Sequence, residues 1–464
     1  MSSYTDFLAR KAVSDPATGL TELPELPGAL FDFQRDITAW ALRRGRAAVF
    51  AGTGLGKTLI ELAWAGAVHE ATGRDVLVLA PLAVAPQVVR EGYKFGIRAK
   101  QCSHQGEVEP GITVTNYQKL DHFDVDHFEG VVLDESSILK ALDGKTKARL
   151  IEAFRDTPYR LAATATPAPN DFMELGNHAE FLGVMSHTEM LSTFFVHDGG
   201  ETQKWRLKGH AESEFWRWMG SWSVMLRTPA DLGYDGAQFE LPKLTQEQHT
   251  VESNDKAPEG MLFAMEAQTL QERLAARRSS VPERVARAAE ITPDDRPFVW
   301  WCHLNSESEA LAKAIPGAVE VRGSDSEERK EQKLLDFAEG RIRVLITKPT
   351  ICGFGLNWQH CSDTGFVGLS DSFEQVYQAI RRFWRFGQQH PVTVHFVASE
   401  LEGAVVDNIR RKEQQAERMA EQMVAHMSDI TAETLRGTAR RKDPSEPKKP
   451  MALPAWVAQH EEAA

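Results

Sequence analysis

The sequence of 464 residues lacks the features that mark several classes of protein. No apolar run approaches the roughly 18 residues that a membrane-spanning helix needs. The N-terminal stretch MSSYTDFLARKAVSDP lacks the continuous apolar core of a secretory signal. The four cysteines, at positions 102, 302, 352 and 361, are scattered without the spacing of metal ligands. We therefore expect a protein of the reducing cytoplasm that has no membrane partner.

Positive charge is also scarce relative to negative charge. The 53 lysines and arginines face 66 aspartates and glutamates, which gives a formal net charge of −13. Such a surface repels a polyanion on average, and this excludes a protein that coats nucleic acid by bulk attraction. A local basic track stays open, because basic residues cluster at 381–388 (RRFWRFGQ), at 410–412 (RRK) and in the tail at 436–449.

Short apolar runs alternate with longer amphipathic stretches along most of the chain. Several runs are apolar on consecutive positions, which is typical of strands buried on both faces of a helix-covered parallel sheet. The length of the chain favours two hydrophobic cores over one. The predicted strands of the first half are 47–50, 75–80, 112–115, 130–135 and 159–164, and those of the second half are 297–302, 318–321, 343–347, 364–369 and 392–398.

Composition predicts five segments. The region 171–250 contains four tryptophans, at positions 205, 216, 218 and 222, which we expect to pack in a core beneath helical elements. A long charged helix is predicted from about Asp407 to Met427, and the proline- and charge-rich stretch after it is typical of disorder. The segments are a lead-in (1–27), a first domain (28–170), a helical extension and linker (171–250), a second domain with its closing helix (251–428) and a disordered tail (429–464).

One stretch, AGTGLGKT at 51–58, follows the first predicted strand directly. A strand that ends in a glycine-rich turn and opens a helix points several backbone N–H groups at one place, where the helix dipole also favours an anion. This arrangement predicts a loop for nucleotide phosphates, with Lys57 on the β and γ phosphates and Thr58 on Mg²⁺. The predicted contacts of the loop are Gly52, Thr53, Gly54, Leu55, Gly56, Lys57 and Thr58.

A second apolar strand ends in acids, in the sequence GVVLDESS. Nucleotide hydrolysis needs a carboxylate for the metal and a base for the attacking water. Asp134 fits the metal role and Glu135 the role of the base. The position of both acids after a buried strand favours a site over a solvated loop.

From about Leu30 to Val397 the chain resembles the helicase-type ATPases of superfamily two, and within them the Swi/Snf family of DNA translocases. FDFQRDITAW is similar to the first family motif, which implies that Gln34 contacts the adenine. LAATATPAPND resembles the motif that couples nucleotide to DNA, and LITKPTICGFGLN and QAIRRFWRFGQ follow in the family's order. The resemblance implies nucleotide contact for Gly355, and coupling or DNA contact for Thr164, Thr166, Asn170, Asn357 and Gln378.

This resemblance also implies a fold, ligands and a mechanism. The fold is α/β, with two tandem RecA-like P-loop domains, each a parallel sheet flanked by helices, and with the ATP site in the cleft between them. The ligands are ATP, Mg²⁺ and double-stranded DNA. The protein would contact the phosphate backbone of the DNA, so binding would not depend on the base sequence. Arg382 and Arg385 would reach across the cleft and stabilise the charge that builds on the γ-phosphate.

Some features depart from the family and leave other functions open. Ser136 and Ser137 stand where family members usually carry Ala-His or Gly-His, so the hydrogen bonding of that motif is not carried over. The alternatives are a helicase that separates strands of DNA or RNA, a nucleotide-gated DNA clamp without significant turnover, and a motor for a nuclease on another chain. The compact size favours a prokaryotic cell or one infected by a phage.

Overall fold

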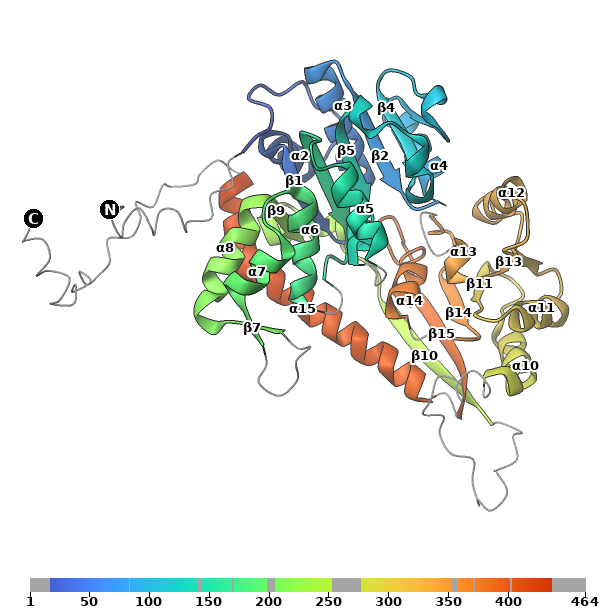
Figure 1. Cartoon of the computed structure of the whole chain (residues 1–464). Helices are drawn as coiled ribbons and strands as arrows, with labels where there is room; N and C mark the ends of the chain where they lie inside the picture. Colours follow the sequence, from blue (N-terminus) through green and yellow to red (C-terminus); the bar gives the residue numbers. More distant parts are fainter. Residues whose placement is uncertain are drawn as a thin grey trace, which may run out of the picture.

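The computed structural model describes residues 17–82, 84–140, 144–168, 171–197, 205–252, 277–352, 357–369, 372–400 and 403–435. Two parallel sheets dominate these residues, and helices cover both (Figure 1). This arrangement confirms the predicted pair of tandem α/β domains. The predicted site residues Asn170 and Gly355, and the chain beyond residue 435, lie outside the described residues.

The first sheet has the strand order β3-β4-β2-β5-β6-β1-β9, and its neighbouring strands all pair in parallel. The five predicted strands are present within two residues of their expected bounds, and β3 and β9 join them at the two edges. The strands are β1 (Arg46–Ala51), β2 (Asp75–Ala80), β3 (Ala99–Gln101), β4 (Ile112–Asn116), β5 (Phe128–Asp134), β6 (Tyr159–Thr164) and β9 (Ser223–Leu226).

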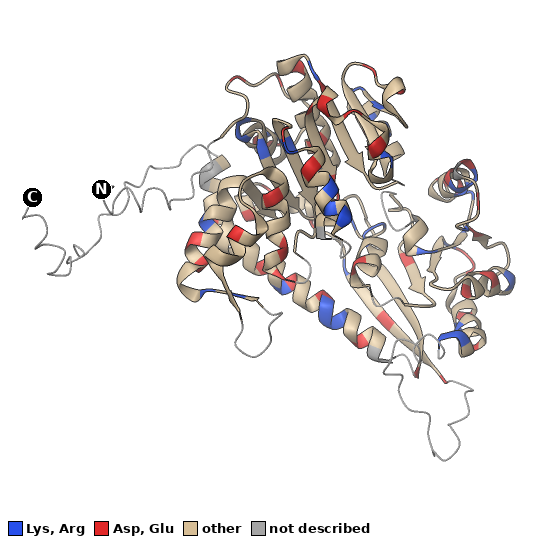
Figure 2. Cartoon of the chain, viewed as in Figure 1, with Lys and Arg blue, Asp and Glu red and all other residues tan. Residues whose placement is uncertain are grey.

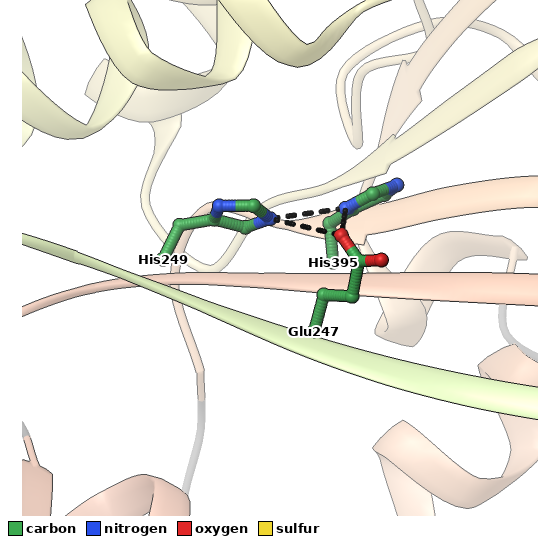
Figure 3. A group of neighbouring side chains, drawn as sticks. All are labelled: Glu247, His249 and His395. Atoms are coloured by element: carbon green, nitrogen blue, oxygen red, sulfur yellow. Dashed lines mark hydrogen bonds and ion pairs between the residues drawn. The ribbon is translucent and has the colours of Figure 1, made fainter.

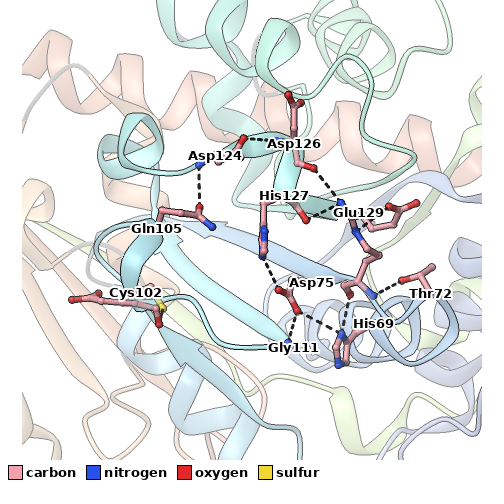
Figure 4. Close-up of polar contacts among 12 residues, drawn as sticks. His69, Thr72, Asp75, Cys102, Gln105, Gly111, Asp124, Asp126, His127 and Glu129 are labelled. Atoms are coloured by element: carbon pink, nitrogen blue, oxygen red, sulfur yellow. Dashed lines mark hydrogen bonds and ion pairs between the residues drawn. The ribbon is translucent and has the colours of Figure 1, made fainter.

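Polar contacts fasten the end of this sheet at which β2 and β5 begin (Figure 4). The Asp75 carboxylate accepts a hydrogen bond from the Gly111 backbone N–H at 2.7 Å, and its other oxygen lies 2.8 Å from Nε2 of His127. His69 bonds the Arg74 carbonyl at 2.8 Å. These contacts hold one end of the strands together, and the glycine loop and the acid pair lie at the opposite, carboxyl end.

Helices cover the two faces of the first sheet and enclose a separate core on each. One face carries α2 (Asp32–Arg44), α3 (Lys57–Thr72) and α4 (Ala85–Lys94). The other carries α5 (Lys145–Ala153), α6 (Leu175–Leu182), α7 (His187–Phe194) and α8 (Glu212–Trp222).

The tryptophan-rich segment belongs to the second of these cores. Trp216, Trp218 and Trp222 are buried there, and Trp205 packs against the same cluster. This confirms the predicted packing role. The segment also contains strands, contrary to its interpretation as helical: β9, and a small antiparallel hairpin of β7 (Phe195–His197) and β8 (Trp205–Leu207).

The second sheet has the order β10-β15-β14-β11-β13-β12, again with all pairs parallel. All five predicted strands are present, and β10 adds an edge strand that was not predicted. The strands are β10 (Leu244–Val251), β11 (Phe298–Trp301), β12 (Val319–Glu320), β13 (Val344–Thr347), β14 (Asp363–Phe366) and β15 (Val392–Ser399). The helices are α10 (Val281–Ile291), α11 (Asn305–Ala314), α12 (Glu327–Ala338), α13 (Pro349–Cys352) and α14 (Phe373–Ile380).

A fully buried ion pair lies inside the second domain. Arg284 of α10 donates to the Glu307 carboxylate at 2.8 Å, and both side chains are inaccessible to solvent. Glu307 also accepts the backbone N–H groups of His303 and Leu304, at 2.8 and 2.9 Å. The Glu307 carboxylate is thus neutralised by Arg284 and accepts two backbone hydrogen bonds. Because no charge is left unbalanced, the pair fixes the packing of α10 on α11.

The last described helix, α15 (Gly403–Leu435), joins the two domains. Val405 and Ile409 near its start belong to a core of the second domain, whereas Met419, Met423 and Met427 insert into the first-domain core under α8. Figure 1 shows this long helix running from the lower end of the second sheet past α8 of the first domain. It extends beyond the predicted end near Met427, because the buried stripe at spacings of four continues through Thr431 to Leu435, which packs against the other core of the first domain.

The described helices include none that combines the length and the apolarity needed to cross a bilayer. Lysine and arginine are interspersed with aspartate and glutamate over most elements (Figure 2). The predicted basic cluster 410–412 lies on α15, where Arg411 is exposed. The cluster 381–388 is different, because Arg382 is buried and faces the first domain.

Candidate nucleotide site

The glycine loop connects β1 to α3 as the sequence predicts. Gly54 and Gly56 have φ values of 88° and 73°, in the left-handed region that glycine enters without steric cost. Lys57 begins α3, and its Nζ donates to the carbonyls of Ala51 and Gly52 at 2.9 and 3.4 Å. The Lys57 side chain therefore lies across the opening of the loop, and its Nζ donates to loop carbonyls where it would otherwise donate to phosphate oxygens.

Gln34 fastens the glycine loop to α2. Its Nε2 donates to the Leu55 carbonyl at 2.9 Å, and its Oε1 accepts the Phe31 backbone N–H at 3.0 Å. The side chain is buried, and a Cβ at Gly56 would meet its Nε2 at 2.3 Å. Contact of Gln34 with adenine stays a prediction, while its contact with the loop is present in the structure.

The acid pair lies beside this loop at the end of β5. Asp134 is buried, and burial raises the pKa of its carboxyl to about 7, with repulsion from Glu135 adding to the shift and Lys57 opposing it. Glu135 has a φ of 53°, which is strained for a residue with a Cβ. Such strain is typical of a side chain that the fold holds in one direction.

Thr164 and Thr166 connect the acid pair to β6. The Thr164 hydroxyl donates to Oε2 of Glu135 at 3.2 Å and accepts the Thr166 backbone N–H at the same distance. A movement of the chain after β6 would thus reach the Glu135 carboxylate through two hydrogen bonds. This connection is the kind that a coupling motif requires.

A further acid near the site, Glu61, escaped the sequence analysis. It lies one helical turn after Lys57 and is fully buried in α3. Burial, together with the charge of Asp134, raises the pKa of its carboxyl well above the usual range and favours its neutral form. Only its place one turn after Lys57 could have revealed it, and a single acid in a helix carries too little pattern for that.

A small cavity of about 90 Å³ joins the two domains. The first domain contributes the glycine loop, Lys57, Thr58 and the acid pair to its wall. The second domain contributes the arginine segment. Its lining residues are Thr53, Gly54, Gly56, Lys57, Thr58, Val84, Gln87, Glu91, Asp134, Glu135, Gln378, Arg381, Arg382 and Arg385.

The arginines of this cavity place positive charge beside the acid pair. The Nε of Arg385 is buried without a hydrogen-bond partner among the described residues, and burial lowers the pKa of its guanidinium. Arg382 is buried and close enough to Asp134 for its positive charge to oppose the rise in the pKa of that carboxyl. A buried guanidinium nitrogen without a partner is costly, and phosphate oxygens would satisfy it.

Phe386 docks the arginine segment on the glycine loop. A Cβ at Gly54 would lie 2.6 Å from the Phe386 backbone nitrogen, so the two backbones touch. The Phe386 ring packs 4.8 Å from that of Phe239 and 6.4 Å from that of Phe31, and both of these residues precede β10, the first strand of the second domain. The arginines are therefore placed by an aromatic contact as well as by α14.

The two serines after the acid pair make contacts of their own. The Ser136 hydroxyl lies 3.1 Å from Nε2 of His178 on α6. Ser137 donates to Glu374 of α14 at 3.3 Å, which links the two domains directly beside the acid pair. These bonds occupy the place of the Ala-His or Gly-His motif whose hydrogen bonding could not be carried over.

A larger cavity of about 880 Å³ adjoins the small one, and Thr53, Gly54 and Arg381 line both. Thr166 lines the larger cavity, whereas Asn357 is exposed.

Thr58 and Asp134 both line the small cavity, and a hydroxyl together with a carboxylate suits Mg²⁺, which prefers oxygen ligands. The described residues therefore fit a magnesium nucleotide, although about 90 Å³ is far below the roughly 300 Å³ at which ligand pockets begin.

Comparison with known proteins adds the fold family. No protein-family model matches the chain, and no curated protein matches its sequence. Among solved structures, the chain is similar to Dbp5 of S. cerevisiae bound to RNA and ADP BeF3, with a TM-score of 0.53 and 12% identity over 85% of this chain and 93% of that one. This likeness confirms the predicted fold of two tandem RecA-like domains.

Proposed function

We propose that this pair of RecA-like domains is a DNA-dependent ATPase of the Swi/Snf type that moves along double-stranded DNA. One observation carries the proposal: a single cavity is lined by Lys57, Asp134 and Glu135 from one domain and by Arg382 and Arg385 from the other. A chain that only bound nucleotide would have no chemical need for a base and two arginines around the same space.

The chemistry follows from where these groups lie. The loop N–H groups and Lys57 bind the phosphates, and Glu135 orients the attacking water and takes its proton. Arg382 and Arg385 face the charge that develops on the transferred phosphoryl group. Thr58 and Asp134 would hold Mg²⁺, which when bound neutralises phosphate charge.

Domain movement follows from the size of the cavity. A nucleotide needs more room than about 90 Å³, and the adjoining cavity of about 880 Å³ is not lined by Lys57 or Thr58. We therefore infer that the arginine segment withdraws from the glycine loop before a nucleotide enters. Hydrolysis then requires the segment to return, because the arginines belong to the other domain. Each cycle thus opens and closes the cleft, and such cycles on a held backbone produce stepping.

The resemblance of the sequence motifs to DNA translocases supports duplex DNA as the track. A second candidate, an RNA-dependent helicase, is favoured by one finding, since the similar structure of Dbp5 is bound to RNA. Both candidates use the same cavity, and they differ in the polymer that stimulates it.

The test is the ATPase rate of the full chain without polymer and with duplex DNA, single-stranded DNA or RNA of equal length. We expect duplex DNA to stimulate the wild type most and Glu135→Gln to abolish hydrolysis while nucleotide still binds. Strongest stimulation by RNA would replace the DNA proposal with the RNA one. A negligible rate with every polymer, no lower in Glu135→Gln, would support a clamp without turnover.

Stepping is tested separately from hydrolysis. A translocase on duplex DNA displaces the third strand of a triplex and leaves a forked duplex intact. Separation of the forked duplex would instead show a strand-separating helicase.

A further inference from the structure

Three side chains able to bind a metal lie on one face of the second sheet, away from the nucleotide site (Figure 3). Glu247 and His249 are two residues apart on β10, so both point to the same side of the strand. His395 of the parallel neighbour β15 stands directly opposite Glu247 in the register. Strand periodicity and strand pairing together therefore bring the three side chains to one place.

The distances among their ligand atoms suit a single ion. Nε2 of His249 lies 3.1 Å from Nδ1 of His395. Oε2 of Glu247 lies 3.4 Å from that Nδ1 and 3.8 Å from that Nε2. The circle through these three atoms has a radius of about 2.0 Å, which matches the 2.0–2.2 Å bonds of zinc to nitrogen and oxygen.

We propose that Glu247, His249 and His395 bind a divalent transition-metal ion of the Zn²⁺ class. Two imidazoles and a carboxylate are a donor set that such ions accept, and the fourth position is left for water. Water has access, because β10 is the edge strand and half of the Glu247 side chain (50%) is exposed. Mg²⁺ is excluded by its preference for oxygen ligands.

The surroundings set the state of the two rings before metal binds. Arg287 of α10 lies 3.4 Å from Nδ1 of His249, and its other nitrogen pairs with Glu290 at 3.0 Å. In that arrangement the His249 Nε2–H donates to Nδ1 of His395. An ion that binds Nε2 therefore requires this proton to move to Nδ1 of His249, where the contact with Arg287 is given up.

Metal binding would fasten β10 to β15. β10 is the first strand of the second domain, and it connects that domain to the first through the chain after β9. An ion that bridges the two strands binds only the folded sheet, so it raises the stability of the second domain as its concentration rises. This effect is independent of the ATPase proposed above.

The experiment uses the full chain, freed of metal by chelation and free of nucleotide. Titration with Co²⁺, followed by its visible absorption, and competition with Zn²⁺ should each give one equivalent bound. Glu247→Gln and His249→Gln should each weaken binding by more than about 100-fold, since even loss of an outer partner costs 10–100-fold. His210→Gln, at an exposed histidine of the first domain, is the matched control and should bind as the wild type.

Glu247→Gln keeps the test valid if the histidine variants unfold, because its side chain is half exposed. Zn²⁺ should also raise the thermal midpoint of the wild type and of His210→Gln, but not that of Glu247→Gln. Absence of stoichiometric binding, or equal binding by Glu247→Gln and the wild type, would overturn the proposal.

Discussion

Asp134→Asn should make the folded protein more stable and at the same time inactive. In the folded chain the pKa of Asp134 is raised from 3.8 to about 7, chiefly by burial. The folded state therefore binds a proton more tightly than the unfolded state, and stability falls as pH rises from about 4 to about 7. A shift of about three units, at roughly 1.4 kcal/mol each, is worth at most about 4 kcal/mol. Asparagine does not ionise and escapes this cost.

The assay is urea unfolding between pH 5 and pH 8. The gain of Asp134→Asn over the wild type should grow from below about 2 kcal/mol at pH 5 to about 4 kcal/mol at pH 8. Asp295→Asn, at an exposed aspartate, is the control and should show no such growth. A variant that is less stable than the wild type at pH 8, or a gain that is the same at every pH, would refute the conclusion that burial destabilises the charge of Asp134.

Other variants test the closure of the cleft and the second core. Arg385→Ala should lower the rate of hydrolysis by about 10³-fold or more while nucleotide affinity changes only a few-fold, and Arg385→Lys should not restore it; turnover near the wild-type rate would contradict its role. Gly54→Ala places a Cβ against Phe386 at 2.6 Å, and we expect at least about tenfold slower hydrolysis with unchanged circular dichroism, whereas full activity would show that the contact is dispensable. Glu307→Ala removes the buried carboxylate to which Arg284 and two backbone N–H groups donate, and it should lower the free energy of unfolding by about 3–5 kcal/mol, as measured by urea titration.

The sequence predicted those parts of the molecule whose signals are local. The β2 run DVLVLA is apolar on consecutive positions, and it forms a strand over those residues because helices cover both faces. The loop around Lys57 follows from a glycine pattern between a strand and a helix, and the acid pair follows from a buried strand that ends in charge. The fold and the first half of the site were therefore predictable from short stretches.

The parts that escaped prediction depend on contacts between distant segments. The edge strand β9 is only four residues long and follows α8 directly, so no turn signal separates them. Glu247, His249 and His395 meet only because β10 pairs with β15, and 146 residues separate the two histidines. The bond from Ser137 to Glu374 likewise spans 237 residues. Periodicity reports which way a side chain points and carries no information about its partner.

The helix α15 limits how the two domains can move relative to each other. Among the described residues, the chain passes from one domain to the other twice, once through the segment before β10 and once through α15, which at about 1.5 Å per residue is roughly 50 Å long. Because the two ends of α15 pack in cores of different domains, any movement of one domain relative to the other must bend this helix or shift one of these contacts.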